Sequence, residues 1–122
     1  MTKSDELMLA AVRMRTGLSV NGRVVSAVGD RVTISLYDVP TICVRFDEGD
    51  IRLSTSVPVT RKSAKVINAV LQAFTDCRMK SMNGVWLLEN RKGEIIPLRE
   101  CFLTIPITRD DVKRSGLERY MG

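Results

Sequence analysis

The chain has 122 residues, of which 44% are hydrophobic and 27% are charged, and these proportions are typical of one folded domain. Its 19 Lys and Arg residues outnumber its 14 Asp and Glu residues and give a formal net charge of +5, while histidine is lacking. This composition disfavours wholesale disorder, and the lack of histidine excludes a Ser-His-Asp triad, a Cys-His pair and a His-ligated zinc site.

The N-terminal segment has the pattern of an amphipathic helix over residues 4–16. Ser4 is a suitable N-cap, the first turn is acidic and the last turn is basic, which suits the helix dipole at both ends. The expected apolar stripe consists of Leu7, Ala11 and Met14. We expect Gly17 to end this helix.

Between Gly17 and about residue 56 the hydrophobic period changes to two, which predicts β-strands. Turn-forming residues separate the strands and lie at Asn21-Gly22, Gly29-Asp30, 38–40 and 47–50. The expected strands are 24–28, 32–37, 41–46 and 51–55. In the second of them Val32, Ile34 and Leu36 should face inward, so a meander of four antiparallel strands follows.

A three- and four-residue spacing of apolar side chains predicts a second helix over residues 61–76. The elements expected after it are strands at 78–82 and 85–89 around an Asn83-Gly84 turn, strands at 95–96 and 102–107, and a short or frayed helix over 108–122. We therefore expect a single α+β domain, 1–122. Its antiparallel sheet of about five to seven strands should carry the helix 61–76 on one face.

The excess positive charge lies in the middle of the chain. Residues 60–92 contain seven bases and two acids, whereas the segments before and after them are neutral. Within this stretch the charges of the predicted helix oppose its dipole, because Arg61 and Lys62 lie in the first turn and Asp76 lies at the end. Each such mismatch costs about 0.3 to 1 kcal/mol. The contrast with the N-terminal helix suggests that these bases serve a partner.

We therefore predict an anion-binding or partner-binding surface around the start of this helix, where free backbone N–H groups, hydroxyls and basic side chains converge. The predicted surface consists of Thr60, Arg61, Lys62, Ser63, Lys65, Arg78, Lys80, Arg91 and Lys92. The last four join it only if their hairpin folds back beside the helix. The alternative is that Thr60 is simply the N-cap and that the bases are solvated.

Other chemistry-bearing residues have more ordinary interpretations. Trp86 suits the core better than a nucleobase-stacking surface. The amide of Asn68 either ties the helix to the preceding loop or is solvated. The acids of segment 47–50 have the spacing of a turn, although a magnesium site is the alternative.

The cysteines offer no activated nucleophile and no metal site. Cys43, Cys77 and Cys101 are far apart, form no C-x-x-C pair and have no histidine to activate them. We expect no catalytic residue, no metal and no cofactor. We therefore expect that the protein is not an enzyme. The odd cysteine number indicates a reduced cytoplasmic setting, and we expect neither a signal peptide nor contact with a membrane.

Four short motifs resemble a pattern found in small proteins of tailed bacteriophages and prophages. The motifs are Leu53-Ser-Thr55, Thr60-x-x-Ser63, Ile67-Asn68-x-x-Leu71 and Gly84-Val-Trp86-Leu87. The similarity covers roughly residues 41–88. It implies a phage or mobile-element origin, and small phage proteins of this kind are often inhibitors or adaptors that bind a host protein, anti-CRISPR factors among them.

The charge distribution and the resemblance together give the leading hypothesis. It is a non-catalytic accessory protein in a bacterial host's cytoplasm that binds a host protein, or a protein–nucleic acid complex, with an acidic surface and inhibits it by occlusion. The alternative is direct binding of nucleic acid through its phosphates. A metal-dependent enzyme using the acids of segment 47–50 is the third and most remote hypothesis.

Overall fold

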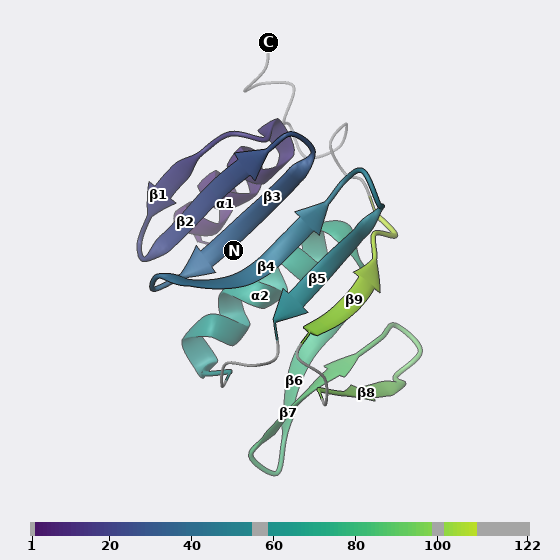
Figure 1. The fold of residues 1–122 in the computed structure, drawn as a ribbon. Coiled ribbons are helices and arrows are strands. Elements are labelled where there is room, and N and C mark those ends of the chain that lie inside the picture. Colours follow the sequence, from purple (N-terminus) through teal and green to yellow (C-terminus); the bar gives the residue numbers. More distant parts are fainter. Residues whose placement is uncertain (1, 55–58, 99–101, 110–122) are drawn as a thin grey trace.

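The computed structural model describes residues 2–54, 59–98 and 102–109, and they form an α+β fold (Figure 1). In chain order the elements are α1 (Lys3–Met14), β1 (Leu18–Val20), β2 (Arg23–Val28), β3 (Arg31–Leu36), β4 (Val39–Arg45), β5 (Asp50–Ser54), α2 (Arg61–Phe74), β6 (Arg78–Met82), β7 (Val85–Glu89), β8 (Ile95–Pro97) and β9 (Phe102–Pro106). The expected helix at the N-terminus, the central helix and the antiparallel strands are confirmed. The predicted helical tail over 108–122 falls almost wholly outside the described residues.

The strands divide between two sheets. The larger sheet has the order β1-β2-β3-β4-β5-β9, and the smaller sheet has the order β6-β7-β8. All neighbouring strands are antiparallel. Both helices lie on one face of the larger sheet, and β9 returns to that sheet after the chain has left it to form the smaller one (Figure 1). Neither described helix has the length and hydrophobicity of a membrane-spanning segment.

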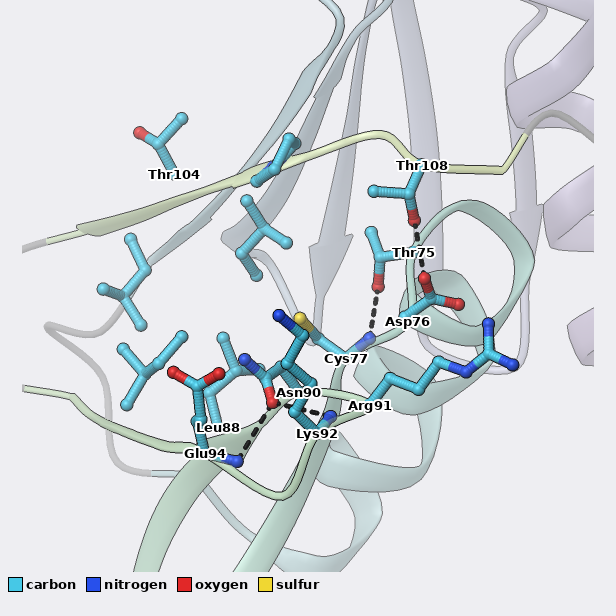
Figure 2. A pocket seen from close by; sticks show the side chains of 14 residues that line it. Thr75, Asp76, Cys77, Leu88, Asn90, Arg91, Lys92, Glu94, Thr104 and Thr108 are labelled. Carbon is cyan, nitrogen blue, oxygen red and sulfur yellow. Dashed lines mark hydrogen bonds between the residues drawn. The ribbon is translucent and has the colours of Figure 1, made fainter.

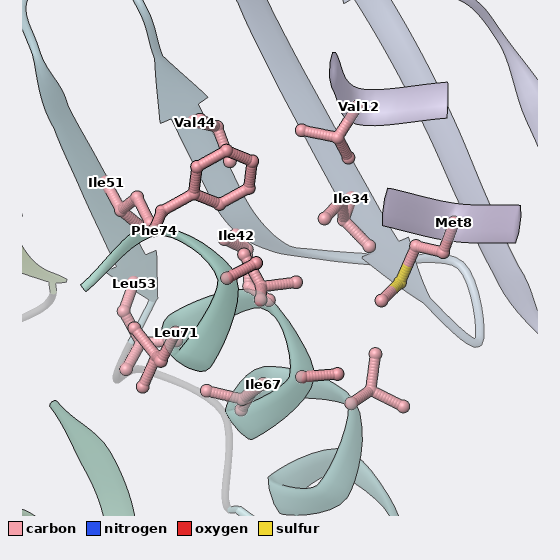
Figure 3. Close-up of a cluster of buried hydrophobic side chains, with 14 of the residues drawn as sticks. Met8, Val12, Ile34, Ile42, Val44, Ile51, Leu53, Ile67, Leu71 and Phe74 are labelled. Atoms are coloured by element: carbon pink, nitrogen blue, oxygen red, sulfur yellow. The ribbon is translucent and has the colours of Figure 1, made fainter. Parts of the chain in front are cut away.

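The core lies between the helices and the inner face of the larger sheet (Figure 3). Val32, Ile34 and Leu36 of β3 are buried as the alternation predicted, and neighbouring strands contribute in the same register. The other large, fully buried side chains include Met8, Ile42, Ile51, Leu53, Ile67, Leu71 and Phe74. Phe74 also packs edge-on against Phe46, with ring centroids 5.8 Å apart. This packing fixes α2 against the middle of the sheet.

The N-terminal helix begins earlier and faces a different way than the sequence suggested. Thr2, not Ser4, is the N-cap: its hydroxyl accepts from Asp5 N at 3.1 Å, and the Asp5 carboxylate accepts from Thr2 N at 3.0 Å. Asp5 is buried and also contacts the Arg23 guanidinium at 2.7 Å. Because this pair fixes the helix rotation, Met8, Ala11 and Val12 turn toward the core.

The expected apolar stripe of α1 is therefore only partly correct. Ala11 is buried, whereas Leu7 and Met14 are 38% and 40% exposed. The helix also stops before Gly17, because Arg15 takes a left-handed conformation with φ of 50° and its N–H caps the last turn.

The second helix ends at Phe74 rather than at residue 76. The Thr75 hydroxyl donates to Leu71 O at 2.7 Å and accepts from Cys77 N at 3.0 Å, which closes the last turn. The Phe74 carbonyl accepts from the N–H groups of Thr108 and Arg109 at 2.8 and 2.9 Å. The segment that follows β9 thus supplies hydrogen-bond donors to a carbonyl group at the C-terminal end of α2.

Asn68 of α2 forms two hydrogen bonds with the first strand of the smaller sheet. The Asn68 amide accepts from Met79 N at 2.6 Å and donates to Met79 O at 3.2 Å. It neither ties the helix to the preceding loop nor is solvated, the two possibilities considered from the sequence, but pairs with the edge of β6 as a neighbouring strand would. The hairpin that follows α2 is thereby held beside the helix.

Candidate functional site

The first turn of α2 begins with a reciprocal cap. Thr60 N donates to the Ser63 hydroxyl at 2.8 Å, and Ser63 N donates to the Thr60 hydroxyl at 3.1 Å. The N-cap interpretation of Thr60 is therefore confirmed. Both hydroxyls are used within the cap, so the groups left for a ligand are the N–H groups of the first turn and the basic side chains.

The basic side chains at this end of the helix are Arg61, Lys62 and Lys65, and all three are exposed. Within residues 2–54, 59–98 and 102–109, no carboxylate forms an ion pair with any of them. The opposite end of α2 differs: Arg109 contacts the Asp76 carboxylate at 3.1 Å and also donates to the Gln72 carbonyl at 3.4 Å. The charge mismatch is thus compensated at the C-terminal end of α2, whereas no described residue compensates it at the N-terminal end.

A hollow of about 510 Å³ adjoins the first turn of α2, and Asn21, Tyr37, Lys62 and Lys65 are among its lining residues. Tyr37 is 65% exposed. Its N–H donates to Gly22 O at 2.9 Å, and its ring lies so close to Gly22 that an added Cβ there would be 2.7 Å from Tyr37 Cε1. An exposed aromatic ring therefore lines the same hollow as two lysines that form no ion pair with any described residue.

Tyr37 was expected to be the last residue of the strand 32–37, and sequence reasoning missed it as a site residue. Tyr37 and Asp38 form the two-residue turn between β3 and β4, with φ of 51° and 69°. Such a turn favours Asn and Gly, because a bulky side chain at positive φ is strained. A tyrosine in a turn that disfavours it is the signal that the sequence offered.

We expect Tyr37→Asn to stabilise the protein while weakening partner binding. Asparagine tolerates the left-handed conformation better than tyrosine does, so the free energy of unfolding should rise by about 0.5 to 1 kcal/mol. Loss of the ring should lower affinity by roughly tenfold if it stacks on the partner. Urea unfolding and a binding titration measure the two effects. Reduced stability, or unchanged affinity, would contradict this role for Tyr37.

The basic residues of the hairpin lie elsewhere and are partly neutralised. Arg78 and Lys80 contact the Glu89 carboxylate at 3.1 and 3.2 Å. Hydrogen bonds from Lys80, which has the larger effect, and from Arg78 lower the pKa of Glu89. Arg91 and Lys92 lie in the turn between β7 and β8 and form no ion pair within the described ranges.

The nine predicted residues therefore do not lie together at one end of α2. Arg91 and Arg78 line a polar hollow together with Gln72 and Asp76, which belong to the C-terminal end of α2. Thr60, Arg61, Lys62, Ser63 and Lys65 lie at its N-terminal end. A helix of 14 residues spans about 20 Å. The described structure thus places the nine residues in two separate regions, at the start of α2 and on the hairpin with the β7–β8 turn, and their role in binding a partner stays a prediction.

A mostly apolar cavity of about 400 Å³ lies between β9 and the smaller sheet (Figure 2). The aliphatic side chains that line it are Leu88, Ile96, Leu103 and Ile105. Cys77 also lines it, and burial raises the pKa of the Cys77 thiol, which makes it a poor nucleophile. Sequence reasoning missed this cavity because it is built from strands of two sheets.

The acids of the turn at 47–50 are held by arginines. Arg31 contacts Asp47 at 3.1 Å and Glu48 at 3.8 Å, and Arg45 contacts Asp50 at 2.6 Å. The described part of the chain holds no cluster of three or more cysteine or carboxylate side chains suited to a metal ion. Hydrogen bonding from Arg45 lowers the pKa of Asp50 although burial opposes this shift.

The pair of Arg45 and Asp50 should make stability depend on pH. Since the folded-state pKa of Asp50 lies below its unfolded value of about 3.9, the stabilisation is present above that value and is lost as pH falls toward the folded pKa. We expect Asp50→Asn to lower the free energy of unfolding by about 1 kcal/mol at pH 7 and by less near pH 2. Denaturant unfolding at both pH values tests this. An equal loss at both would refute it.

The two other residues noted in the sequence have limited roles in the described structure. Trp86 is partly buried and packs against the core cluster. Cys43 is a partly exposed free thiol, and Cys101 lies outside the described residues.

Comparison with known proteins finds no matching family model, no matching curated protein and no matching solved structure.

Proposed function

We propose that this protein is a non-catalytic accessory protein that binds an acidic surface of a host macromolecule and blocks it. The contact is the cationic turn of α2, formed by Arg61, Lys62 and Lys65. One observation carries the proposal: the charges of α2 are compensated at its C-terminal end by Arg109, but not at its N-terminal end by any described residue. A surface that costs the helix stability in the free protein is explained by a partner that supplies the missing negative charge.

The resemblance of the 41–88 segment to small phage proteins supports a host target and an inhibitory role in the bacterial cytoplasm. Occlusion needs only a stable surface and no reactive group. The rigid placement of α2 against the sheet supports such a surface, because Phe74, Ile67 and Leu71 fix the helix in the core. Electrostatic steering toward an acidic target would also speed association.

Direct binding to nucleic acid is the second candidate. The observation that favours it is that the exposed Tyr37 lines the same hollow as Lys62 and Lys65, since stacking and phosphate contacts together hold single strands. The two candidates differ in their response to salt. Phosphate binding weakens steeply as ionic strength rises and persists with naked DNA or RNA.

A pull-down from bacterial lysate, with and without nuclease, tests the proposal. We expect the same host protein to be retained under both conditions, and we expect no mobility shift of naked DNA or RNA at low salt. Loss of the retained protein after nuclease, together with a mobility shift, would refute a protein partner and support direct binding to nucleic acid. Retention that is unaffected by charge reversal at Arg61 and Lys62 would refute the cationic turn as the contact.

A further inference from the structure

Among the described residues, the larger sheet ends at β9, which pairs with β5 on one side and with no other described strand. Ile107 N donates to Gly49 O at 2.9 Å, so odd-numbered residues of this segment bond toward β5. Because bonding directions alternate along an antiparallel strand, the N–H and C=O groups of Phe102 and Thr104 point away from β5. Pro106 fits this pattern, since its position requires no N–H on the β5 side. Two N–H donors, of Phe102 and Thr104, and three carbonyl acceptors, of Phe102, Thr104 and Pro106, therefore point to the side of β9 away from β5.

The apolar cavity lies directly beside this edge. Leu103 and Ile105 of β9 form one wall, and Leu88 and Ile96 of the smaller sheet form another. In a strand added beside β9, alternate side chains would point to the cavity side at intervals of about 6.6 to 6.8 Å. The open edge thus supplies hydrogen bonds and the cavity accepts aliphatic side chains, which are the two requirements for recognising an extended peptide.

Charge at one end of the cavity indicates what kind of peptide fits. Arg91 lies beside Asp76, whose carboxylate is already paired with Arg109 (Figure 2). Arg91 and Lys92 line the cavity and have no carboxylate partner in the described ranges, and Glu94 is the one acid there that is also without an ion pair. The unpaired charge at this end is therefore net positive, and it complements an acidic side chain.

We propose that the edge of β9 and its cavity bind an extended segment of a partner protein as an added strand. Apolar side chains of the segment enter the cavity beside Leu103 and Ile105, and an acidic side chain follows at Arg91. This inference rests on the proposed function, because it supplies a second contact to a protein partner. A nucleic acid has no main chain that matches the strand edge, so a polypeptide is the occupant that the edge selects.

A random peptide library displayed on cells tests the inference with the intact protein as bait. We expect enriched peptides to alternate aliphatic and other residues and to carry Asp or Glu near one end. A synthetic fluorescent copy of the most enriched peptide then gives affinities by anisotropy. Affinity should fall at least about tenfold in Thr104→Pro, which removes one outward N–H, and in Arg91→Glu combined with Lys92→Glu.

The matched control is Ser19→Pro on β1, the opposite edge of the same sheet. Ser19 is exposed and lies opposite Val24, whose main chain bonds toward β3, so its N–H also points outward. This variant should bind the peptide as the wild type does. Thermal unfolding of all variants shows whether a variant that fails to bind the peptide is still folded. The double variant Arg91→Glu and Lys92→Glu leaves the main chain of β9 unchanged.

Two results would overturn the inference: no enrichment of any peptide by the wild type, or equal affinity for the enriched peptide in the wild type and in Thr104→Pro. The proposed function fails differently. If charge reversal at Arg61 and Lys62 leaves host-protein retention unchanged while Thr104→Pro abolishes peptide binding, the cationic turn is refuted and the strand edge stands. The opposite pattern refutes the strand edge alone.

Discussion

Reversing two charges at the start of α2, with Arg61→Glu and Lys62→Glu, should stabilise the protein and abolish partner binding. Acidic side chains in the first turn interact favourably with the helix dipole, whereas the native bases oppose it, and each is worth about 0.3 to 1 kcal/mol. The midpoint of thermal unfolding should therefore rise by roughly 3 to 8 °C. Binding to an acidic surface should weaken by about 100-fold or more, because attraction becomes repulsion.

The control is a variant with the same change in net charge placed elsewhere. Lys3→Glu combined with Arg52→Glu alters two exposed bases, one at the start of α1 and one on β5, where Arg52 lies 4.8 Å from the Phe102 ring centroid. This variant should lose less than about tenfold in affinity, through long-range steering alone. Equal losses in both variants would mean that only net charge matters. A lower unfolding midpoint in the first variant would contradict the electrostatic description of α2.

Sequence alone predicted those features that depend on near neighbours in the chain. Asn83-Gly84 was assigned as a hairpin turn and Asn21-Gly22 as a tight turn before the strand 24–28, and all four residues have positive φ. The strand β1 that precedes Asn21 was not predicted. The alternation in β3 and the apolar spacing in α2 gave the correct buried faces. Thr60 was recognised as an N-cap because capping is decided within one turn. These local signals were sufficient for the α+β class and for most of the strands.

The remaining features depend on contacts between distant segments. The rotation of α1 follows from the pair of Asp5 and Arg23, and neither residue alone indicates it. The compensation of Asp76 comes from Arg109, which the return of β9 to the larger sheet brings to the end of α2. The apolar cavity likewise exists only because β9 and the smaller sheet lie side by side. No spacing within one segment encodes such contacts.

Replacing Asn68 by alanine should be among the most destabilising changes at a polar residue of this chain. The side chain bonds both the N–H and the C=O of Met79, and these bonds close the open edge of β6. Alanine leaves two partly buried main-chain groups without that partner, which should lower the free energy of unfolding by about 2 to 3 kcal/mol. The smaller sheet should loosen first, since the two lost hydrogen bonds join its β6 strand to α2.

Gln72→Ala is the matched control, because Gln72 is an exposed amide one turn further along the same helix and only its main chain is used. It should change stability by less than about 0.5 kcal/mol. Urea unfolding gives the global loss, and hydrogen exchange at the Met79 amide reports the local opening. If Asn68→Ala costs no more than Gln72→Ala, or if exchange at Met79 is unchanged, Asn68 does not hold the smaller sheet. If both predictions hold, Asn68→Ala should also weaken peptide binding at β9, because Leu88 and Ile96 of that sheet form a wall of the cavity.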